Sequence, residues 1–278
     1  MSSFHQKSSF TADGVAYRRT FADIPLSKEI WDALLEIQGP PPDEEMAWMN
    51  QLGALPFFEA RYRLTDRELI KSGFRQILEL APGLSGRGIL MTQSPEMIYV
   101  EMDLPDKIAT KQKVIGQLLK RKQIEPRQNL FLEPGNVVDE NDFRRASAHF
   151  RDDEPVAVVC EGLLRYLSFS DKEILAGHIR RLIKRAGGLW ITPDIEYPVK
   201  NSFTNGSLHL KKITGLSVQS NLFRDETHAE TFFDSLGFTV SKIPVMEMAK
   251  ELACVKKFNV GHKHVQNVLG NRWTYLMR

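Results

Sequence analysis

Short apolar runs alternate with helical patterns through most of the chain. Each run is bounded by turn residues, as is typical of strands. The seven expected strands cover residues 74–80, 97–102, 129–132, 156–160, 188–192, 238–243 and 273–277. The expected helices cover residues 27–37, 66–72, 107–120, 141–149, 170–184 and 230–235. This alternation predicts an α/β fold with a mainly parallel sheet, and the last two runs, which lack a good helical crossover, predict an antiparallel closing pair.

Two segments depart from the alternating pattern. Residues 1–60 lack strand alternation and contain one expected helix, with Ser27 as its N-cap and Gly39 at its end, so we expect an N-terminal helical extension or cap. Residues 196–230 hold Pro198, Gly206, Gly215 and many polar residues, which predicts a loop-rich lid insertion. Both belong to an expected single domain of residues 1–278.

Composition excludes several classes of protein. Of the 278 residues, 42% are apolar and 26% charged, which argues against a disordered, fibrous or membrane-spanning chain. A net charge of +2 gives no support for a nucleic-acid partner. The two cysteines, Cys160 and Cys254, build no disulfide framework, so we expect a cytoplasmic protein. No metal site is expected.

Residues suited to a nucleoside cofactor follow the first two expected strands. Gly83 stands where the loop leaves the first strand, after Glu79 and Ala81, and a glycine there permits close approach of a ligand or simply a tight turn. Glu101 and Asp103 end the second strand about twenty residues later, the spacing of an acid that holds ribose hydroxyls. Asp103 also precedes Pro105, so a helix N-cap is the alternative.

Two further strand ends carry candidate groups. Asn136 and Val137 follow the third strand, where an amide oxygen and an apolar side chain could meet an adenine ring, although the segment also suits an ordinary turn. Glu161 ends the fourth strand, with Tyr166 shortly after it. Its carboxylate suits the ammonium group of a ligand or an exposed surface position.

In this order, the motifs resemble those of the leucine carboxyl methyltransferase family, including its polyketide O-methyltransferase-like members. The likeness covers most of residues 60–200 and is strongest in the segments QILELAPGLSGR (76–87), YVEMDLP (99–105, with Lys111 downstream) and CEGLLRYLS (160–168). The resemblance implies a Rossmann-like methyltransferase fold with a seven-stranded sheet, an antiparallel C-terminal strand and helices on both faces, and S-adenosyl-L-methionine as cofactor.

The resemblance also implies roles for single residues. Gly83 would line the methionine part of the cofactor, Asp103 hold the ribose, Asn136 and Val137 flank the adenine, and Glu161 meet the ammonium group. An arginine before the first strand binds the methionine carboxylate in this family; Arg61 is preferred here over Arg63. The chain departs from the family pattern in having Ala81 where glycine is usual, Ser85-Gly86 where Asp-Thr is usual, and Asn136 where aspartate is usual.

The implied reaction is O-methylation of a carboxyl or hydroxyl group on a small molecule. A carboxylate acceptor needs mainly orientation, whereas a hydroxyl needs a general base. The candidate catalytic groups are Tyr166 and His209, with His178 and His228 as further possible bases. A homodimer is compatible with the sequence, and neither a nucleic-acid nor a membrane partner is expected.

Three other functions remain open at this point. The first is carboxyl methylation of a protein C-terminus. The second is a nicotinamide-dependent reductase, because Gly83, Gly86 and Gly88 followed by Asp103 also suit a dinucleotide; Tyr197 and Lys200 lack the spacing of the usual proton-donor pair. The third is a non-catalytic methyltransferase-like scaffold, since a fold alone proves no activity.

Overall fold

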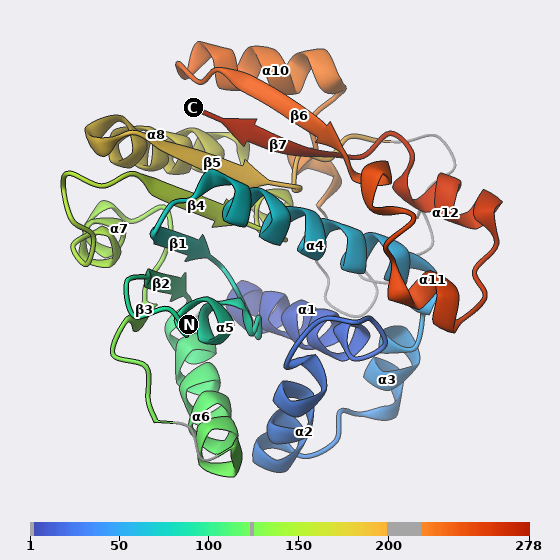
Figure 1. Cartoon of the computed structure of the whole chain (residues 1–278). Coiled ribbons are helices and arrows are strands. Elements are labelled where there is room, and N and C mark those ends of the chain that lie inside the picture. The colour runs from blue at the N-terminus through green and yellow to red at the C-terminus, as the bar shows by residue number, and fades with distance from the viewer. Residues whose placement is uncertain (1–2, 123–124, 199–217) are drawn as a thin grey trace.

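The computed structural model describes residues 3–122, 125–198 and 218–278. Within these ranges seven strands form one sheet in the order β3-β2-β1-β4-β5-β7-β6 (Figure 1). The strands are β1 (Gln76–Leu80), β2 (Ile98–Asp103), β3 (Leu130–Pro134), β4 (Val156–Cys160), β5 (Gly188–Thr192), β6 (Val240–Pro244) and β7 (Trp273–Met277). Strands β1 to β5 pair in parallel, and β7 runs antiparallel to both β5 and β6. The predicted Rossmann-like fold is confirmed.

Helices cover both faces of the sheet. Strand residues such as Leu78, Val158 and Trp190 face α7 (Glu140–Ser147), α8 (Phe169–Ala186) and α10 (Glu226–Ser235). Their neighbours in sequence, such as Ile77 and Val159, face the opposite layer, which contains α4 (Leu55–Ser72), α5 (Arg87–Met91) and α6 (Pro105–Lys122). Because side chains alternate along a strand, fully apolar strands such as β4 supply both cores.

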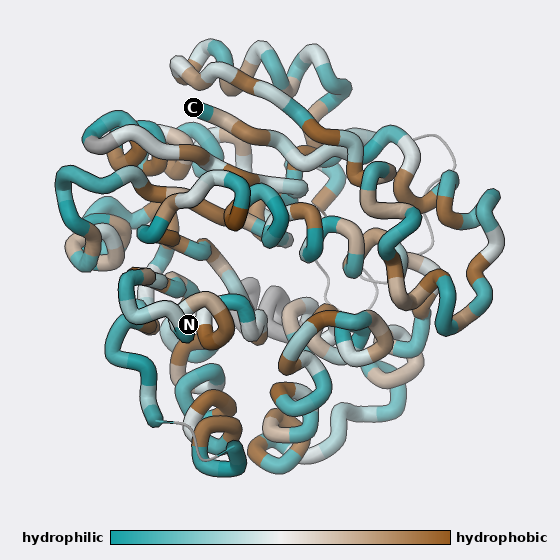
Figure 2. Tube along the Cα trace, in the orientation of Figure 1, coloured by the Kyte–Doolittle hydropathy of each residue, from teal (hydrophilic) through white to brown (hydrophobic). Residues whose placement is uncertain are grey.

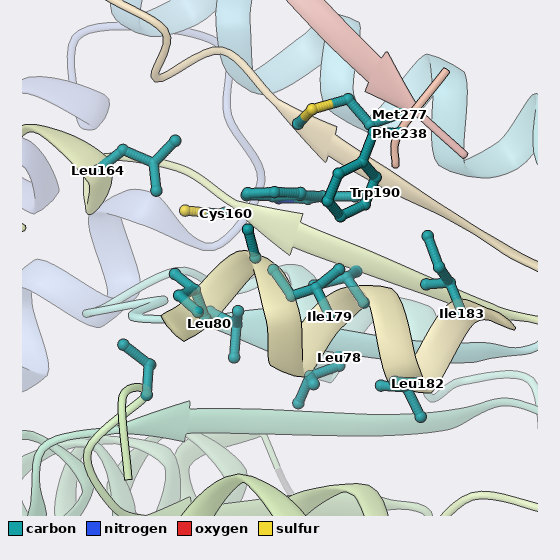
Figure 3. Close-up of a cluster of buried hydrophobic side chains, with 14 of the residues drawn as sticks. Leu78, Leu80, Cys160, Leu164, Ile179, Leu182, Ile183, Trp190, Phe238 and Met277 are labelled. Carbon is teal, nitrogen blue, oxygen red and sulfur yellow. The ribbon is translucent and has the colours of Figure 1, made fainter. Parts of the chain in front are cut away.

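The largest core lies between the sheet and α8. Figure 3 shows Leu78, Cys160 and Trp190 on the strands, with Ile179 and Leu182 of α8 lying against them. All of these side chains are buried. Burial of this apolar surface fixes the sheet against α8, and with it the ends of β1 and β4.

Residues 3–54 contain α1 (Ser3–Arg19), α2 (Ser27–Gln38), α3 (Asp43–Met49) and the 3-10 turn η1 (Leu52–Ala54). Apolar side chains of α2, including Trp31 and Leu34, pack with Val114 and Leu118 of α6, where brown segments of both helices face each other in Figure 2. The one helix expected in this segment, at residues 27–37, corresponds to α2, whereas α1 and α3 were not expected.

Several helix ends differ from the sequence-based expectation. Ser27 is the first residue of α2, and the N-cap is Leu26, which has a φ of 65° and no side-chain cap bond, so the assignment of Ser27 as N-cap was wrong. Gly39 and Gly73 do end α2 and α4 with positive φ. Helix α4 starts at Leu55, eleven residues before the expected start at Asp66, because Leu55, Phe57 and Leu64 are buried against the C-terminal region.

That C-terminal region holds η4 (Val245–Met248), α11 (Ala253–Lys257) and α12 (His262–Leu269), which pack on α4. Helix α10 begins at Glu226, inside the segment 196–230 expected to be loop-rich, and η3 (Gln219–Asn221) precedes it. Residues 199–217, with His209, lie outside the described residues, so the lid stays a prediction. Among the described helices, none combines the length and the apolar character that crossing a bilayer requires.

Candidate functional site

The predicted cofactor residues gather where the parallel strands end, along what we call the carboxyl edge of the sheet. The loop after β1 and the end of β2 are joined directly there: the Gly83 amide donates to Oδ2 of Asp103 at 2.9 Å, and Oδ1 of Asp103 accepts from the Leu104 amide at 2.8 Å. These bonds hold Asp103 between two loops. Each carboxylate oxygen keeps a lone pair for another donor, so the group still suits two ribose hydroxyls.

The loop after β1, which contains Gly83, uses its backbone amides differently from the expected contact with a ligand. Ala81 has a φ of 50° and Gly83 a φ of 54°, both in the left-handed region that favours glycine. The Ala81 amide donates to the Met102 carbonyl, and the Gly83 amide donates to Asp103. Both amides therefore bond to other groups of the protein. A β-carbon at Gly83 would lie 3.2 Å from Cβ of Ala12 in α1, which shows that glycine permits close packing of α1 on this loop.

Glu161 lies at the centre of a buried group of arginines. Its Oε1 is 2.7 Å from Nη2 of Arg19 and 3.1 Å from Nε of Arg61, and its Oε2 is 3.2 Å from Nη2 of Arg87. Burial by itself raises the pKa of Glu161, but the three arginines together lower it to about 2. The side chain is only 3% exposed, which excludes the surface position considered for it.

Arg61 and Arg63 lie in different surroundings. Arg61 is buried beside Glu161, with its guanidinium 4.9 Å from the ring centre of Phe58. Arg63 is partly buried and pairs with the buried Glu59 and with the exposed Asp23. Of the two, Arg61 is therefore the one placed to meet a ligand carboxylate at the carboxyl edge.

Glu79 anchors the loop. Its carboxylate pairs with Arg87, just after the loop, and accepts from the Tyr99 hydroxyl at 2.7 Å. Since Arg87 also reaches Glu161, Glu79 acts on the site through Arg87. A carboxylate at this place could anchor the loop or bind a ligand's ammonium group, and the contacts of Glu79 are those of an anchor.

Glu101 lies in β2, is fully buried, and pairs with Lys111 of α6. Burial raises its pKa to about 7, against the opposing charge of Lys111. The pair attaches α6 to β2. This position makes Glu101 a supporting group and leaves Asp103 as the acid of β2 at the carboxyl edge.

The turn after β3 carries the predicted adenine residues. Asn136 is exposed, and its Oδ1 accepts from the Val138 amide at 3.2 Å. Val137 is buried, and its carbonyl lies 3.2 Å from Nδ1 of His178. The turn thus presents an amide group beside a fixed apolar side chain at the carboxyl edge.

Helix α1 crosses this edge. Thr11 accepts from the Tyr166 hydroxyl at 3.2 Å, Asp13 pairs with Lys107 at 3.0 Å, and Arg19 pairs with Glu161. Together with the Ala12 contact at Gly83, these interactions place α1 over residues from β1, β2 and β4. The candidate Tyr166 is thereby held by its hydroxyl against the N-terminal extension.

The remaining histidine candidates lie elsewhere. His178 contacts the Val137 carbonyl, and His228 accepts from the Arg224 amide at 3.1 Å and packs on Phe169. His209 is outside the described residues. Among the described residues, no group of three or more His, Cys, Asp or Glu side chains is arranged to hold a metal ion.

Sequence reasoning missed Asp194, Arg19 and Arg87. Asp194 follows β5, is 3% exposed, and accepts from the amides of Gly162 at 2.5 Å and Leu163 at 2.6 Å. Asp194 therefore fixes the conformation of the loop that follows Glu161. An acid just after the fifth strand was the available signal for Asp194, whereas Arg19 lies in a helix that the sequence pattern did not reveal.

Comparison with known proteins assigns the chain to a family. The model of the leucine carboxyl methyltransferase family matches residues 14–179, more than half of the chain, from α1 into α8. The chain belongs to this family. The matched segment contains Arg19, Arg61, Gly83, Asp103 and Glu161, the residues brought together at the carboxyl edge.

Two further proteins are similar to this chain, one in sequence and one in structure. A Parafrankia sp. (strain EAN1pec) protein, which carries the name of an S-adenosyl-L-methionine-dependent methyltransferase, is 30% identical over 150 residues, 51% of this chain and 46% of that protein. The chain thus matches less than half the length of that relative. A DUF574 family protein from Streptomyces avermitilis MA-4680 has a similar structure, with a TM-score of 0.54, 15% identity, and coverage of 95% of this chain and 96% of that one. This second likeness shows the shared fold.

Proposed function

We propose that the chain transfers a methyl group from S-adenosyl-L-methionine to an oxygen atom of a small molecule, a carboxyl or a hydroxyl group. Membership of a methyltransferase family supports the reaction class. The observation that carries the proposal is the meeting of Asp103, Glu161 and Arg61 at the carboxyl edge of one parallel sheet.

The residues present fit this cofactor. Asp103 offers a carboxylate for ribose hydroxyls, and the amide-bearing turn of Asn136 and Val137 suits adenine. Arg61 and Glu161 provide opposite charges for an amino-acid group, and Nε of Arg19 is buried without a hydrogen-bond partner among the described residues. When bound, the cofactor supplies a methyl group activated by its sulfonium.

The chain's own contribution is orientation. Displacement at a methyl carbon requires the acceptor oxygen and the methyl group to be aligned away from water, and such positioning supplies several kcal/mol. Glu161 is a poor general base, because its pKa is about 2 and its carboxylate faces three arginines. A hydroxyl acceptor would therefore need a base other than Glu161, whereas a carboxylate acceptor needs none.

Methyl transfer can be measured with the full-length protein and cofactor carrying a radiolabelled methyl group. A panel of small carboxylic acids, phenols and alcohols serves as acceptors, and mild alkali distinguishes esters, which release methanol, from stable ethers. We expect transfer to an acid with an alkali-labile product. Tight binding of NADH and none of S-adenosylhomocysteine would instead identify a reductase, and cofactor binding without any methylated acceptor would favour the scaffold.

A further inference from the structure

Lys172 of α8 is a buried cation held by backbone and aromatic groups. The residue is 1% exposed, and its Nζ donates to the carbonyls of Leu167 at 2.6 Å and Asn221 at 2.7 Å. Nζ also lies 4.6 Å from the ring centre of Phe169 and 5.7 Å from that of Phe223, close enough for cation–π attraction. Among the described residues, no acidic side chain forms an ion pair with Lys172. Its hydrogen bonds therefore join α8 to the backbone of two loops.

Burial of this ammonium group has a cost in stability. Burial lowers the pKa of Lys172 to about 8, and the charge of Asp171 opposes this effect. The Asp171 carboxylate itself accepts from Ser168 in the capping box of α8. A charge that is taken from water without an ionic partner destabilises the folded state unless its other bonds compensate. An apolar side chain would fill the position without this cost, so the two hydrogen bonds of Lys172 point to a role beyond packing.

The two loops that Lys172 joins follow β4 and β5. Leu167 ends the 3-10 turn after β4, and Asn221 belongs to η3, which follows β5 in sequence. Nδ2 of Asn221 donates to the carbonyl of Arg165 at 3.2 Å. The carbonyls on either side of Tyr166 are thus both bonded, one by Asn221 and the other by Lys172. We call Lys172 and Asn221 the clamp.

The clamp holds the candidate Tyr166 beside the cofactor loop. The Tyr166 hydroxyl donates to Thr11 of α1, and the next residue of α1, Ala12, packs on Gly83. The rate of a methyl displacement depends steeply on how the acceptor is aligned. A side chain whose backbone is fixed on both sides can supply such alignment.

We propose that the clamp positions Tyr166 for methyl transfer, so that Lys172 and Asn221 are positioning residues of the reaction. The clamp fixes the backbone of the turn, and Tyr166 meets the acceptor. This inference rests on the proposed function, because it names residues that orient the acceptor in the same site. The role of Lys172 does not require its charge, since a neutral amine still has two N–H groups for the two carbonyls.

A double-mutant cycle with the full-length protein tests the proposal. Lys172→Met removes both hydrogen bonds at similar side-chain volume, and kcat is measured with the acceptor found in the methyl-transfer panel. We expect kcat to fall about tenfold when Tyr166 is present and less than about twofold in a Tyr166→Ala background, because coupled residues have non-additive effects. The Kd of S-adenosylhomocysteine should change less than about twofold. If Lys172 served the fold alone, kcat would fall equally in both backgrounds, and the proposal would be overturned.

Asn221→Ala tests the other side of the clamp, because it removes the bond to Arg165 and keeps the backbone carbonyl that accepts from Lys172. We expect kcat to fall about threefold, again only when Tyr166 is present. This variant decides the proposal if Lys172→Met fails to fold, which thermal unfolding shows. Lys184→Met, at an exposed position on the same helix, is the matched control and should leave kcat unchanged.

Amide hydrogen exchange tests the clamp without any acceptor. In the unliganded protein, residues 164–168 should exchange about tenfold faster in Lys172→Met than in the unaltered protein, because the turn loses an anchor. Lys184→Met should leave this exchange unchanged. Unchanged exchange in Lys172→Met would overturn the clamp and the proposal with it. If the unaltered protein methylated no acceptor, the proposed function and the positioning role would fail together, whereas faster exchange would still establish the clamp as the support of Tyr166.

Discussion

Ala81 and Gly83, two left-handed residues on either side of Pro82 in the loop after β1, differ in what a β-carbon meets. At Ala81 (φ 50°) the chain already tolerates a β-carbon, whereas at Gly83 (φ 54°) a β-carbon would also press on Ala12. The departure from the family's usual glycine at position 81 is therefore accommodated as a left-handed alanine that is only partly buried.

We therefore expect opposite effects on the free energy of unfolding when Gly83 is replaced by alanine and when Ala81 is replaced by glycine. Gly83→Ala should lower the free energy of unfolding by about 1–2 kcal/mol, because left-handed geometry is costly for alanine and α1 is displaced. Ala81→Gly should leave it unchanged or raise it slightly. Urea unfolding followed by circular dichroism measures both, and a Gly83→Ala protein as stable as Ala81→Gly would contradict the packing of α1 on the loop.

The ionisation of Glu161 makes the free energy of unfolding depend on pH. Its pKa of about 2 in the folded protein lies below the usual value of 4.5, so its contribution is fully present above pH 4.5 and is lost as the pH falls toward 2. Glu161→Gln leaves three arginines without their shared anion and should cost about 3 kcal/mol at pH 7.

Urea unfolding at several pH values tests this expectation. The difference in stability between the unaltered protein and Glu161→Gln should shrink from pH 5 downward, whereas the exposed control Glu140→Gln should behave like the unaltered protein. A difference that stays constant across this range would show that the charge of Glu161 is not what stabilises the site.

At the scale of elements, the strands were predictable and the N-terminal helices largely were not. All seven strands appear within two residues of the expected bounds, because short apolar runs such as Val156–Cys160 have one stable arrangement inside an α/β sheet. Helix α1 has a mostly polar sequence with few apolar positions, so its helicity depends on contacts that pattern reading cannot see. Likewise Asp103 and Glu161 were found from strand ends, but their arginine and amide partners come from distant elements.

The loop between β4 and the 3-10 turn η2 (Leu164–Tyr166) depends on Asp194, which lies two residues after β5. Asp194→Asn should lower the free energy of unfolding by about 2 kcal/mol, because an amide nitrogen in place of one oxygen leaves backbone amides of Gly162 or Leu163 unpaired. We also expect S-adenosylhomocysteine to bind several-fold more weakly, through displacement of Glu161. Asp153→Asn, exposed at the other end of β4, is the control in both measurements. Unchanged affinity in Asp194→Asn would separate the loop from the cofactor site.

At the scale of the whole molecule, the N-terminal extension and the sheet share one site. Helix α2 fixes the extension against α6 through apolar packing, whereas α1 meets the carboxyl edge largely through polar contacts at Lys107, Glu161 and Tyr166. Such contacts break at lower cost than a hydrophobic interface, so α1 is the part of the extension expected to open.

Amide hydrogen exchange measures this opening. If α1 has to lift for the ligand to leave, S-adenosylhomocysteine at one hundred times its dissociation constant should slow exchange in residues 11–19 about a hundredfold. Amides of α12, which packs on the far end of α4, should keep their rates. Equal exchange in α1 with and without ligand would mean that the ligand enters by another route.

The contacts of α1 also bear on how the chain is made. Its partners Lys107, Glu161 and Tyr166 follow their contact residues in α1 by 94, 142 and 155 positions. A ribosome therefore releases α1 long before the residues that receive it have been translated. Until β4 emerges, the nascent α1 has no docking partner at Glu161 and is exposed to proteases and chaperones, so truncated products ending before residue 160 should be cleared rapidly.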